Sequence, residues 1–527
     1  MTTSPRSRFF RTGAASALAV TFLVSGCTNG KERGGTDEAS GLEDAGDAVV
    51  PFVQDLGSDA PSPDPVDVDV SANPSSTALS ADNIGISFEA TDLTDPRWDP
   101  DAGNLDEVLA ELGSPGLRFG GNQLDRGMFW TSSGELPPAG KVAVTPDDLS
   151  RVARTVEKVN ASVTLGIPLG DYDPERGADM VAHAKQAFGS HLLAVSIGNE
   201  PNGFTADHRE GLKIRDTAEW DEDAYLTQVE AYRSAIEQRV GNDVSLVGPG
   251  VAEGSWMTAF LDAGFDETVA LSQHWYATYE CTSDVVPGRG PEWENLVNPL
   301  AHDSAERLLS IGLDKATAAD IPLWVEETGP TSCPGTNDTS RTHASALWTV
   351  DYVLHAAEMG VERMNMHSML GACRGGAPMS VVCSAEGTAE DGDGEVLTQP
   401  NFQGLRLAQI GVGGTFHDVA VSGSEASGRD AYAYAVRTEG SYIVTIVNSA
   451  DAAQYGNREV TVTVPEGFTA ERAAQIHAPS NAAQSETGYR ELAEFADSGS
   501  GVKSAEDGRL VIDLAPSTAT TIEFVHA

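Results

Sequence analysis

Eight short apolar runs, each followed by an amphipathic stretch, fill residues 83 to 370 of this sequence. Between the runs, segments such as 146–160, 224–240 and 345–360 space their apolar residues three or four apart, as helices do. Eight strand-then-helix units in a row predict an α/β fold, a (β/α)8 TIM barrel with long loops. The predicted strands lie at 83–89, 115–121, 162–169, 192–200, 244–250, 267–276, 321–327 and 362–370.

A doubly wound open sheet is the alternative arrangement of such units. That fold rarely reaches eight units without a nucleotide-binding fingerprint. The nearest glycine-rich cluster, GVGGTF at 411–416, neither follows a strand nor matches GxGxxG. The barrel is therefore favoured over residues 81–414.

From about residue 415 the pattern changes to short alternating strands separated by Gly, Asn and Pro. Segments such as 441–449 and 509–515 have the period of two that half-buried strands show. We expect a C-terminal β-sandwich over residues 415–527.

The N-terminus reads as an export signal. Three arginines precede an apolar run from Ala14 to Val24, and LVSGC then ends at Cys27. The small residues before Cys27 resemble a bacterial lipobox, which predicts a signal peptide over 1–26 and lipidation of Cys27 outside the cytoplasm. An ordinary cleaved signal with a stray cysteine is the alternative.

Residues 27–80 are acidic and poor in large apolar side chains, which predicts a flexible tether. A strand at 66–70, where valine alternates with aspartate, could still join the sandwich. The formal charge of the whole chain is -46. Because that field repels polyanions, nucleic acid is excluded as a partner, and the membrane is reached only through the lipid anchor.

Four cysteines remain beside Cys27, an even number that suggests disulfides in an exported protein. Three pairings are possible, and local closure favours Cys373 with Cys383, leaving Cys281 with Cys333. Free buried thiols are the alternative. The spacing fits no zinc site, so no metal is expected.

Carboxylates end several predicted strands, and in a TIM barrel chemistry lies at the C-terminal ends of the strands. In the strand at 192–200, Val195 and Ile197 share one parity and Glu200 has the other, so Glu200 faces the mouth. The same reasoning places Glu89 at the mouth of the first strand.

The seventh strand ends in LWVEET and offers both Glu326 and Glu327. If the branched residues Leu323 and Val325 face the lumen, then Glu327 shares their face. Two carboxyls across one pocket suit cleavage of a glycosidic bond, since one protonates the leaving oxygen while the other attacks the anomeric carbon. Solvated or Arg-paired glutamates are the alternative.

Five segments in chain order resemble glycoside hydrolase family 79, which includes β-glucuronidases and heparanase. They are ISFEATDLTDPRW, LRFGGNQLD, GNEPNGF, QHWY and LWVEET, and they span residues 84 to 327. The resemblance implies a retaining enzyme in which Glu200 is the acid/base and Glu327 the nucleophile.

The same resemblance implies that Asn199 holds the sugar 2-hydroxyl and that Tyr276 orients the nucleophile. It further implies that Glu89 and Asn122 line the sugar subsite. His274 is either a substrate contact or a packed structural residue. Arg118 is expected to brace the acids below the site. Asn365 and His367 share a parity in the last strand, but neither is assigned to the site. Arg374 is a candidate for binding a carboxylate, with a plain surface arginine as the alternative.

The favoured function is an exo-acting β-glucuronidase that needs no cofactor, because two carboxylates and water complete the reaction. The negative charge argues against an endo-enzyme acting on polyanions, which would need a basic cleft. A retaining β-glycosidase for a neutral sugar and a non-catalytic glycan-binding lipoprotein are the alternatives.

Overall fold

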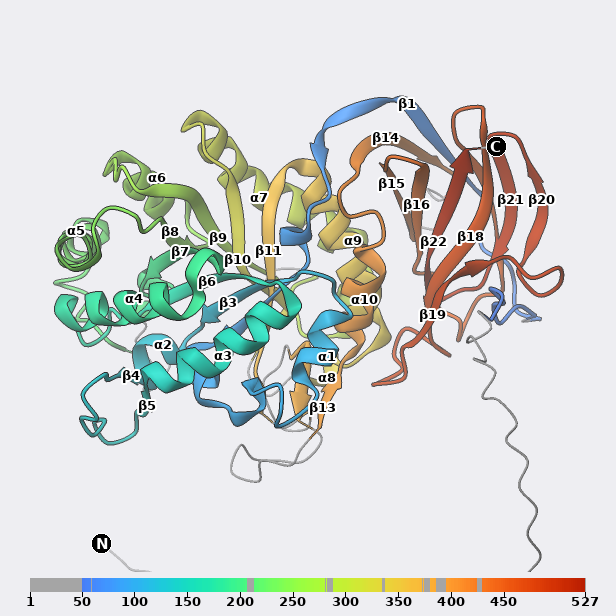
Figure 1. Ribbon diagram of the computed structural model, residues 1–527. Helices are drawn as coiled ribbons and strands as arrows, with labels where there is room; N and C mark the ends of the chain where they lie inside the picture. The colour runs from blue at the N-terminus through green and yellow to red at the C-terminus, as the bar shows by residue number, and fades with distance from the viewer. Residues whose placement is uncertain are drawn as a thin grey trace, which may run out of the picture. The chain divides into compact units, whose positions relative to one another are not determined.

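Eight parallel strands close into a barrel in the order β10-β11-β2-β3-β6-β7-β8-β9, as the alternating pattern predicted (Figure 1). The chain thus runs once around the barrel, each strand beside the next one in sequence. The strands are β2 (Gly85–Glu89), β3 (Gly116–Gly120), β6 (Ser162–Ile167), β7 (Leu192–Ile197), β8 (Leu246–Val251), β9 (Thr268–Thr278), β10 (Leu323–Thr331) and β11 (Val361–Ser368).

The computed structural model describes residues 50–57, 59–205, 213–279, 281, 288–333, 337–371, 373, 380–384, 395–423 and 429–526. The predicted signal peptide, Cys27, the first part of the tether and Arg374 lie outside these residues.

Helices form the outer layer of the barrel (Figure 1). The longer ones are α1 (Leu105–Ala110), α3 (Pro146–Val159), α4 (Pro174–Phe188), α5 (Glu222–Val240), α6 (Gly254–Asp262), α7 (Pro299–Ala318), α9 (His343–Met359) and α10 (Pro400–Ala408). Shorter elements on the loops include α2 (Gln123–Arg126), α8 (Asn337–Ser340), β4 (Met128–Trp130), β5 (Val142–Val144), β12 (Val382–Ser384) and β13 (Val396–Thr398). In the described part of the chain, no helix is long and apolar enough to cross a bilayer.

Local sequence sets the ends of these helices. At α3, Thr145 and Asp148 form a capping box and Pro146 occupies the first turn. The helix ends at Val159 and is capped by Asn160, whose φ of 51° is the left-handed conformation that asparagine tolerates better than most residues. These signals explain why the predicted span of 146–160 agrees with the observed helix.

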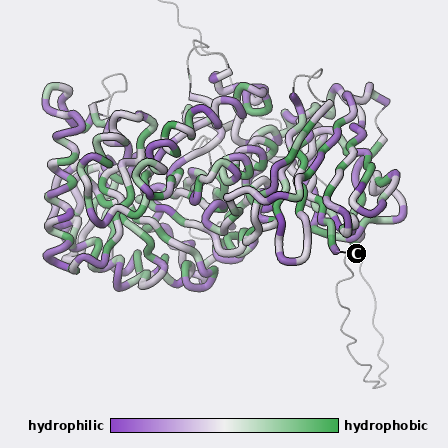
Figure 2. The backbone as a smooth tube through the Cα atoms, turned by 90° about the horizontal axis from the view of Figure 1, so that it is seen from above, coloured by the Kyte–Doolittle hydropathy of each residue, from purple (hydrophilic) through white to green (hydrophobic). Residues whose placement is uncertain are grey.

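The strand side chains alternate between the helical layer and the lumen. Ile86 and Phe88 of β2 are fully buried in the large core under the helices, and Phe88 packs against Trp98 at 5.1 Å between ring centroids. On the other parity, Ala194 and Val247 form a separate small cluster inside the barrel. Figure 2 shows apolar stretches concentrated in the inner elements and polar ones at the outer turns.

The C-terminal domain is one sheet of ten strands in the order β19-β18-β22-β16-β15-β14-β1-β17-β21-β20. Residues from both halves of that order, such as Val444 and Ile512, share one core, so the sheet folds over on itself as a sandwich. Its strands are β14 (Thr415–Ser422), β15 (Ala431–Arg437), β16 (Ser441–Asn448), β17 (Arg458–Thr463), β18 (Phe468–His477), β19 (Gly488–Glu494), β20 (Val502–Glu506), β21 (Arg509–Leu514), β22 (Thr518–His526) and the N-terminal β1 (Val66–Ala78).

The expected strand at 66–70 is confirmed and is longer than predicted. β1 pairs antiparallel with β14 and parallel with β17, and Val66, Val68 and Val70 face the sandwich core. The prediction of a flexible tether as far as residue 80 is wrong for its second half. Phe52 is buried, and the Gln54 amide donates to the backbone of Ser500 and Asp513.

The barrel and the sandwich meet along α9. Tyr434 of β15 donates to Asp351 of α9 over 2.6 Å, and Nε2 of His343 lies 2.9 Å from the carbonyl of Ser517.

Both favoured disulfides, Cys281–Cys333 and Cys373–Cys383, are present.

Candidate active site

Six of the seven predicted site residues meet at the C-terminal ends of the barrel strands, and the seventh lies beside them. They come from β2, β9 and β10 and from the turns that follow β3 and β7. The contacts that join them are short and specific, and most of the side chains are buried.

Glu200 follows β7 in an unusual backbone conformation. Its φ is 47°, the left-handed region that a residue with a Cβ rarely adopts, and Gly198 before it has φ of 76°. Such a conformation costs about 1 kcal/mol or more and persists where the surroundings hold it. The side chain is 33% exposed, and its Oε1 lies 3.1 Å from Nδ1 of His274. Glu200 is therefore presented to the open side of the pocket.

Glu327 is the buried partner, only 5% exposed at its side chain. Its Oε2 accepts from Arg118 Nη1 at 2.8 Å, and its Oε1 accepts from the Tyr276 hydroxyl at 2.7 Å. Burial by itself raises the pKa of Glu327, but His367, His274, Arg118 and Tyr276 together outweigh it and hold that pKa well below the usual range. Glu327 is thus a carboxylate at neutral pH.

The two acids lie close together. One oxygen of Glu200, one of Glu327 and a ring nitrogen of His274 are all within 4.8 Å of one another. Retaining glycosidases hold their carboxyls about 5 to 5.5 Å apart, whereas inverting ones need roughly 6.5 to 9.5 Å for a water. The spacing therefore suits direct attack on an anomeric carbon.

Among the described residues, this trio is the one group of three His, Cys, Asp or Glu side chains close enough to share a cation. Its atoms are already engaged, since Glu327 accepts from Arg118 and Tyr276, and His274 faces Glu200. We interpret it as a hydrogen-bonded carboxylate pair and assign no metal to it.

The reasoning that placed Glu327 on the face of Leu323 and Val325 is corrected by the structure. Those two residues pack in the core under the helices, while Trp324 packs with the lumen cluster. Between Val325 and Glu327 the register of β10 against β9 shifts by one residue, a β-bulge. The bulge brings both Glu326 and Glu327 into the barrel, Glu326 deep inside and Glu327 at the mouth.

Asn199 is positioned from two sides. Its Oδ1 accepts from Arg118 Nη2 at 2.7 Å, and its backbone N–H donates to Asp125 at 2.8 Å. Its Nδ2 is buried without a hydrogen-bond partner in the described structure. An orphan donor beside both acids is available to a substrate hydroxyl.

Glu89 lies on the opposite side of the pocket. Its Oε2 accepts the backbone N–H of Gln123 at 2.7 Å, next to Asn122, and its Oε1 lies 3.6 Å from Nε2 of His367. Asn122 is half-buried and accepts from Arg126 at 2.9 Å. It therefore lies beside Glu89 in the chain turn whose next residue, Gln123, donates to that carboxylate.

The sequence analysis assigns no site role to His367, but the structure places this residue in the site. It bridges the two sides of the pocket, since Nδ1 lies 4.0 Å from Glu327 Oε2. Burial lowers the pKa of His367, but Glu327 and Glu89 outweigh burial and raise it. Parity alone could have found this residue, because it is the next inward position after Asn365.

Asp125 supports the site but is not among the residues that the sequence analysis predicts. It is buried and accepts three backbone N–H groups, from Leu169, Gly170 and Asn199, at 2.7 to 2.8 Å. It thereby joins α2 to the ends of β6 and β7. The only signal in the sequence is its place in LRFGGNQLD, because its partners come from other strands.

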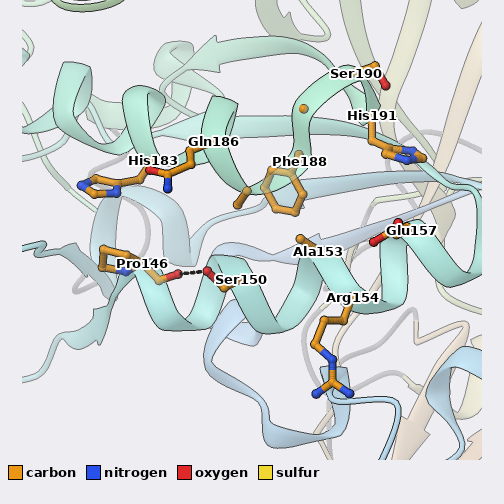
Figure 3. A pocket seen from close by; sticks show the side chains of 12 residues that line it. Pro146, Ser150, Ala153, Arg154, Glu157, His183, Gln186, Phe188, Ser190 and His191 are labelled. Carbon is orange, nitrogen blue, oxygen red and sulfur yellow. Dashed lines mark hydrogen bonds between the residues drawn. The ribbon is translucent and has the colours of Figure 1, made fainter.

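A hollow of about 700 Å³ lies elsewhere, between α3 and α4 on the outside of the barrel (Figure 3). Arg154 and Glu157 of α3 and His183 and Gln186 of α4 line it. None of the predicted site residues reaches it, and Arg154 is already paired with Asp99. The volume of a hollow therefore does not identify the active site in this molecule.

No protein-family model matches the sequence, and no curated protein matches it in a sequence comparison. Solved structures do resemble the fold. A 4-O-α-L-rhamnosyl-β-D-glucuronidase from Fusarium oxysporum 12S matches with a TM-score of 0.64 at 18% identity, covering 86% of this chain and 99% of that one.

Two further structures match over the same region. A GH51 arabinofuranosidase from Xanthomonas axonopodis pv. citri gives a TM-score of 0.61 at 13% identity, covering 88% of this chain and 100% of that one. A β-xylosidase from Caulobacter crescentus CB15 gives 0.55 at 12% identity, covering 87% and 99%. The chain therefore has the barrel-and-sandwich fold seen in these glycoside hydrolases.

Proposed function

We propose that the protein is a retaining glycoside hydrolase with Glu327 as nucleophile and Glu200 as acid/base. The observation that carries the proposal is the pair itself, an ionised buried carboxylate within 4.8 Å of a half-exposed one. Pairs of this spacing perform double displacement at an anomeric carbon.

In the first step Glu327 forms a bond to the anomeric carbon while Glu200 gives its proton to the departing oxygen. In the second step Glu200 takes a proton from water, whose oxygen replaces Glu327 at the same carbon. Arg118 and Tyr276 hold Glu327 in place, and the Nδ2 of Asn199 is available to the 2-hydroxyl of the sugar.

We further propose a terminal β-linked uronic acid as the substrate, removed by exo action. Support comes from the resemblance of five segments to glycoside hydrolase family 79 and from the glucuronidase among the structural neighbours. The formal charge of -46 disfavours attack within a polyanion. A neutral sugar is the second candidate, supported by the arabinofuranosidase and xylosidase neighbours.

A panel of p-nitrophenyl glycosides tests both candidates. We expect turnover of the β-D-glucuronide, with the β-anomer as the first product by NMR. Turnover of a neutral glycoside alone would contradict the uronic acid, and an inverted first anomer would contradict the retaining mechanism. Glycan binding without any turnover would favour the non-catalytic alternative.

Two substitutions test the choice between the neighbouring acids. Glu327→Ala should reduce turnover by at least about a thousandfold, because the nucleophile is lost. Full activity in Glu327→Ala together with its loss in Glu326→Ala would show that the assignment is reversed.

We also propose that the mature chain is anchored by a lipid on Cys27 at the extracellular face of the membrane. The apolar run and lipobox-like LVSGC support this location. Cys27→Ser should release the activity from the membrane fraction, and persistence of the anchored protein in that variant would contradict the proposal.

A further inference from the structure

Charged side chains of alternating sign form a column along the inside of the barrel. From the bottom upward, Asp82 contacts Arg363 at 2.5 Å, and Arg363 contacts Glu326 at 3.1 Å. Above them, Glu326 lies 3.9 Å from Nε of Arg118, and Arg118 contacts Glu327 at 2.8 Å. The column therefore ends on the nucleophile.

Glu326 is fixed in the middle of this column. Its Oε1 accepts from Arg363 and from Asn365, each at 3.1 Å, and its Oε2 accepts from the hydroxyl of Thr164 at 2.5 Å. The residue is only 1% exposed. The side chain of Glu326 is thus held below the pocket by hydrogen bonds to Arg363, Asn365 and Thr164.

One guanidinium serves both carboxylates. Arg118 donates from Nη1 to Glu327 and from Nη2 to Asn199. Its Nε has no hydrogen-bond partner among the described residues and faces Glu326. At low dielectric, a second anion near a cation reduces the stabilisation that the first anion receives. Glu326 therefore opposes the effect of Arg118 on Glu327.

We propose that Glu326 is a positioning residue that shares Arg118 with Glu327 and so keeps the nucleophile basic enough to attack. This inference rests on the proposed function. It gives the doubled acid of LWVEET a role, because the bulge in β10 that brings Glu327 to the mouth also inserts Glu326 beside Arg118.

The two half-reactions respond in opposite ways to the basicity of Glu327. A more basic carboxylate attacks the anomeric carbon faster, but it leaves the glycosyl-enzyme more slowly when water replaces it. The charge of Glu326 thus favours formation of the glycosyl-enzyme at the expense of its breakdown.

The test is Glu326→Gln, which keeps the shape and removes the charge, with p-nitrophenyl and alkyl glycosides of the sugar that the wild type accepts. We expect the acid limb of kcat/KM to move down by about half to one pH unit. We also expect kcat/KM on the alkyl glycoside to fall about threefold to tenfold, while kcat on the p-nitrophenyl glycoside is retained or rises.

Thr164→Val is the second variant and keeps the carboxyl group of Glu326. Without the hydroxyl donor, the ionised form of Glu326 is less stabilised, so its negative charge beside Arg118 is weakened and the acid limb should move down, as in Glu326→Gln. This variant tests the inference even if Glu326→Gln does not fold. A thermal unfolding curve of each variant verifies that the native state is measured.

An equal fall of kcat and kcat/KM with an unmoved acid limb would overturn the inference and leave Glu326 a structural residue. Equal pH profiles in Thr164→Val and wild type would also overturn it. If the wild type turns over no glycoside, the proposed function fails first. An active wild type with unshifted variants contradicts only the role of Glu326.

Discussion

The hydroxyl of Tyr276 donates to Glu327 over 2.7 Å, on the oxygen opposite the one that Arg118 holds. Burial and the charge of Glu327 raise the pKa of Tyr276 well above its usual value, so the phenol keeps its proton and remains a donor. Glu327, the proposed nucleophile, is therefore fixed by a neutral donor on one oxygen and a cation on the other.

Tyr276→Phe should remove one charge-assisted hydrogen bond and leave Glu327 free to rotate. Such a bond is worth about 1.5 to 3 kcal/mol, so we expect kcat/KM to fall by roughly tenfold to a hundredfold. Steady-state kinetics on the p-nitrophenyl substrate measure it. Tyr279→Phe, an exposed tyrosine just beyond the same strand, is the matched control and should stay near wild type. An unchanged rate in Tyr276→Phe would show that Arg118 alone positions the nucleophile.

Glu200→Ala should slow substrates with poor leaving groups most. Without a proton donor, an alkyl glycoside loses about a hundredfold to ten-thousandfold, whereas a p-nitrophenolate leaves nearly unaided. Azide should partly restore the rate, because the anion replaces the water that Glu200 no longer activates. Glu253→Ala serves as control, since Glu253 is a carboxylate near Asn202 outside the proposed machinery. Equal losses on both substrates would contradict the acid/base role.

Asp125→Ala should destabilise the protein because three N–H groups lose their acceptor. Each buried unsatisfied group costs about 1 to 3 kcal/mol, although relaxation and water entry reduce the sum, so we expect a loss of about 3 kcal/mol. Urea unfolding measures it. Asp171→Ala is the control, as Asp171 is 52% exposed and pairs with Lys141, a contact worth about 0 to 1 kcal/mol. Similar unfolding midpoints would show that water replaces the carboxylate.

His343 makes the contact between barrel and sandwich sensitive to acid. Burial lowers the pKa of His343 to about 3, below the value of about 6.5 in the unfolded chain. Because the folded pKa is depressed, the stability is complete above pH 6.5 and is lost as the pH falls toward 3. This one group should cost about 2 kcal/mol at pH 5 relative to pH 7.

Unfolding free energies at pH 7 and pH 5 test this expectation against His343→Gln. The glutamine variant should be less stable at pH 7, since it loses contacts to Thr487 and Ser517. It should also lose less stability between the two pH values than the wild type. Parallel slopes in both proteins would assign the acid sensitivity to other groups.

The two disulfides should differ in their effect on stability. Cys281–Cys333 closes 52 residues and Cys373–Cys383 closes 10. Loop entropy predicts about 4 kcal/mol for the first and about 2.7 kcal/mol for the second. Paired Cys→Ser variants, unfolded under identical conditions, measure both. A larger loss for the shorter loop would show that local packing outweighs chain entropy.

Regular strands allowed the sequence to predict side-chain direction correctly. At β2, uninterrupted alternation placed Glu89 at the mouth, as observed. Glu200 also lies at the mouth, but β7 ends at Ile197, and the left-handed turn at Gly198 and Glu200 directs its side chain. At β10 the alternation gave the wrong side-chain directions, because a β-bulge changes the parity. No residue of LWVEET indicates the bulge. The position of Glu327 agrees with the motif resemblance, not with the alternation.

Residues held by partners from distant strands were the hardest to predict. Alternation gives the inward direction of His367, but its contacts with Glu89 and Glu327 come from β2 and β10, which flank β11 in the barrel and are remote from it in sequence. The segment around Phe52 was assigned to the tether because its composition is polar. Its order depends on backbone pairing with Glu494 and Ala496, which composition does not encode.

The place of β1 between β14 and β17 governs how the chain can assemble. β1 is synthesised before the barrel strands, so it must wait for partners that emerge only after the whole barrel has been synthesised. The barrel can close while the nascent chain is still growing, but the sandwich cannot. A chain interrupted before β17 would therefore leave the alternating valines of β1 as an unpaired edge, open to pairing with another molecule.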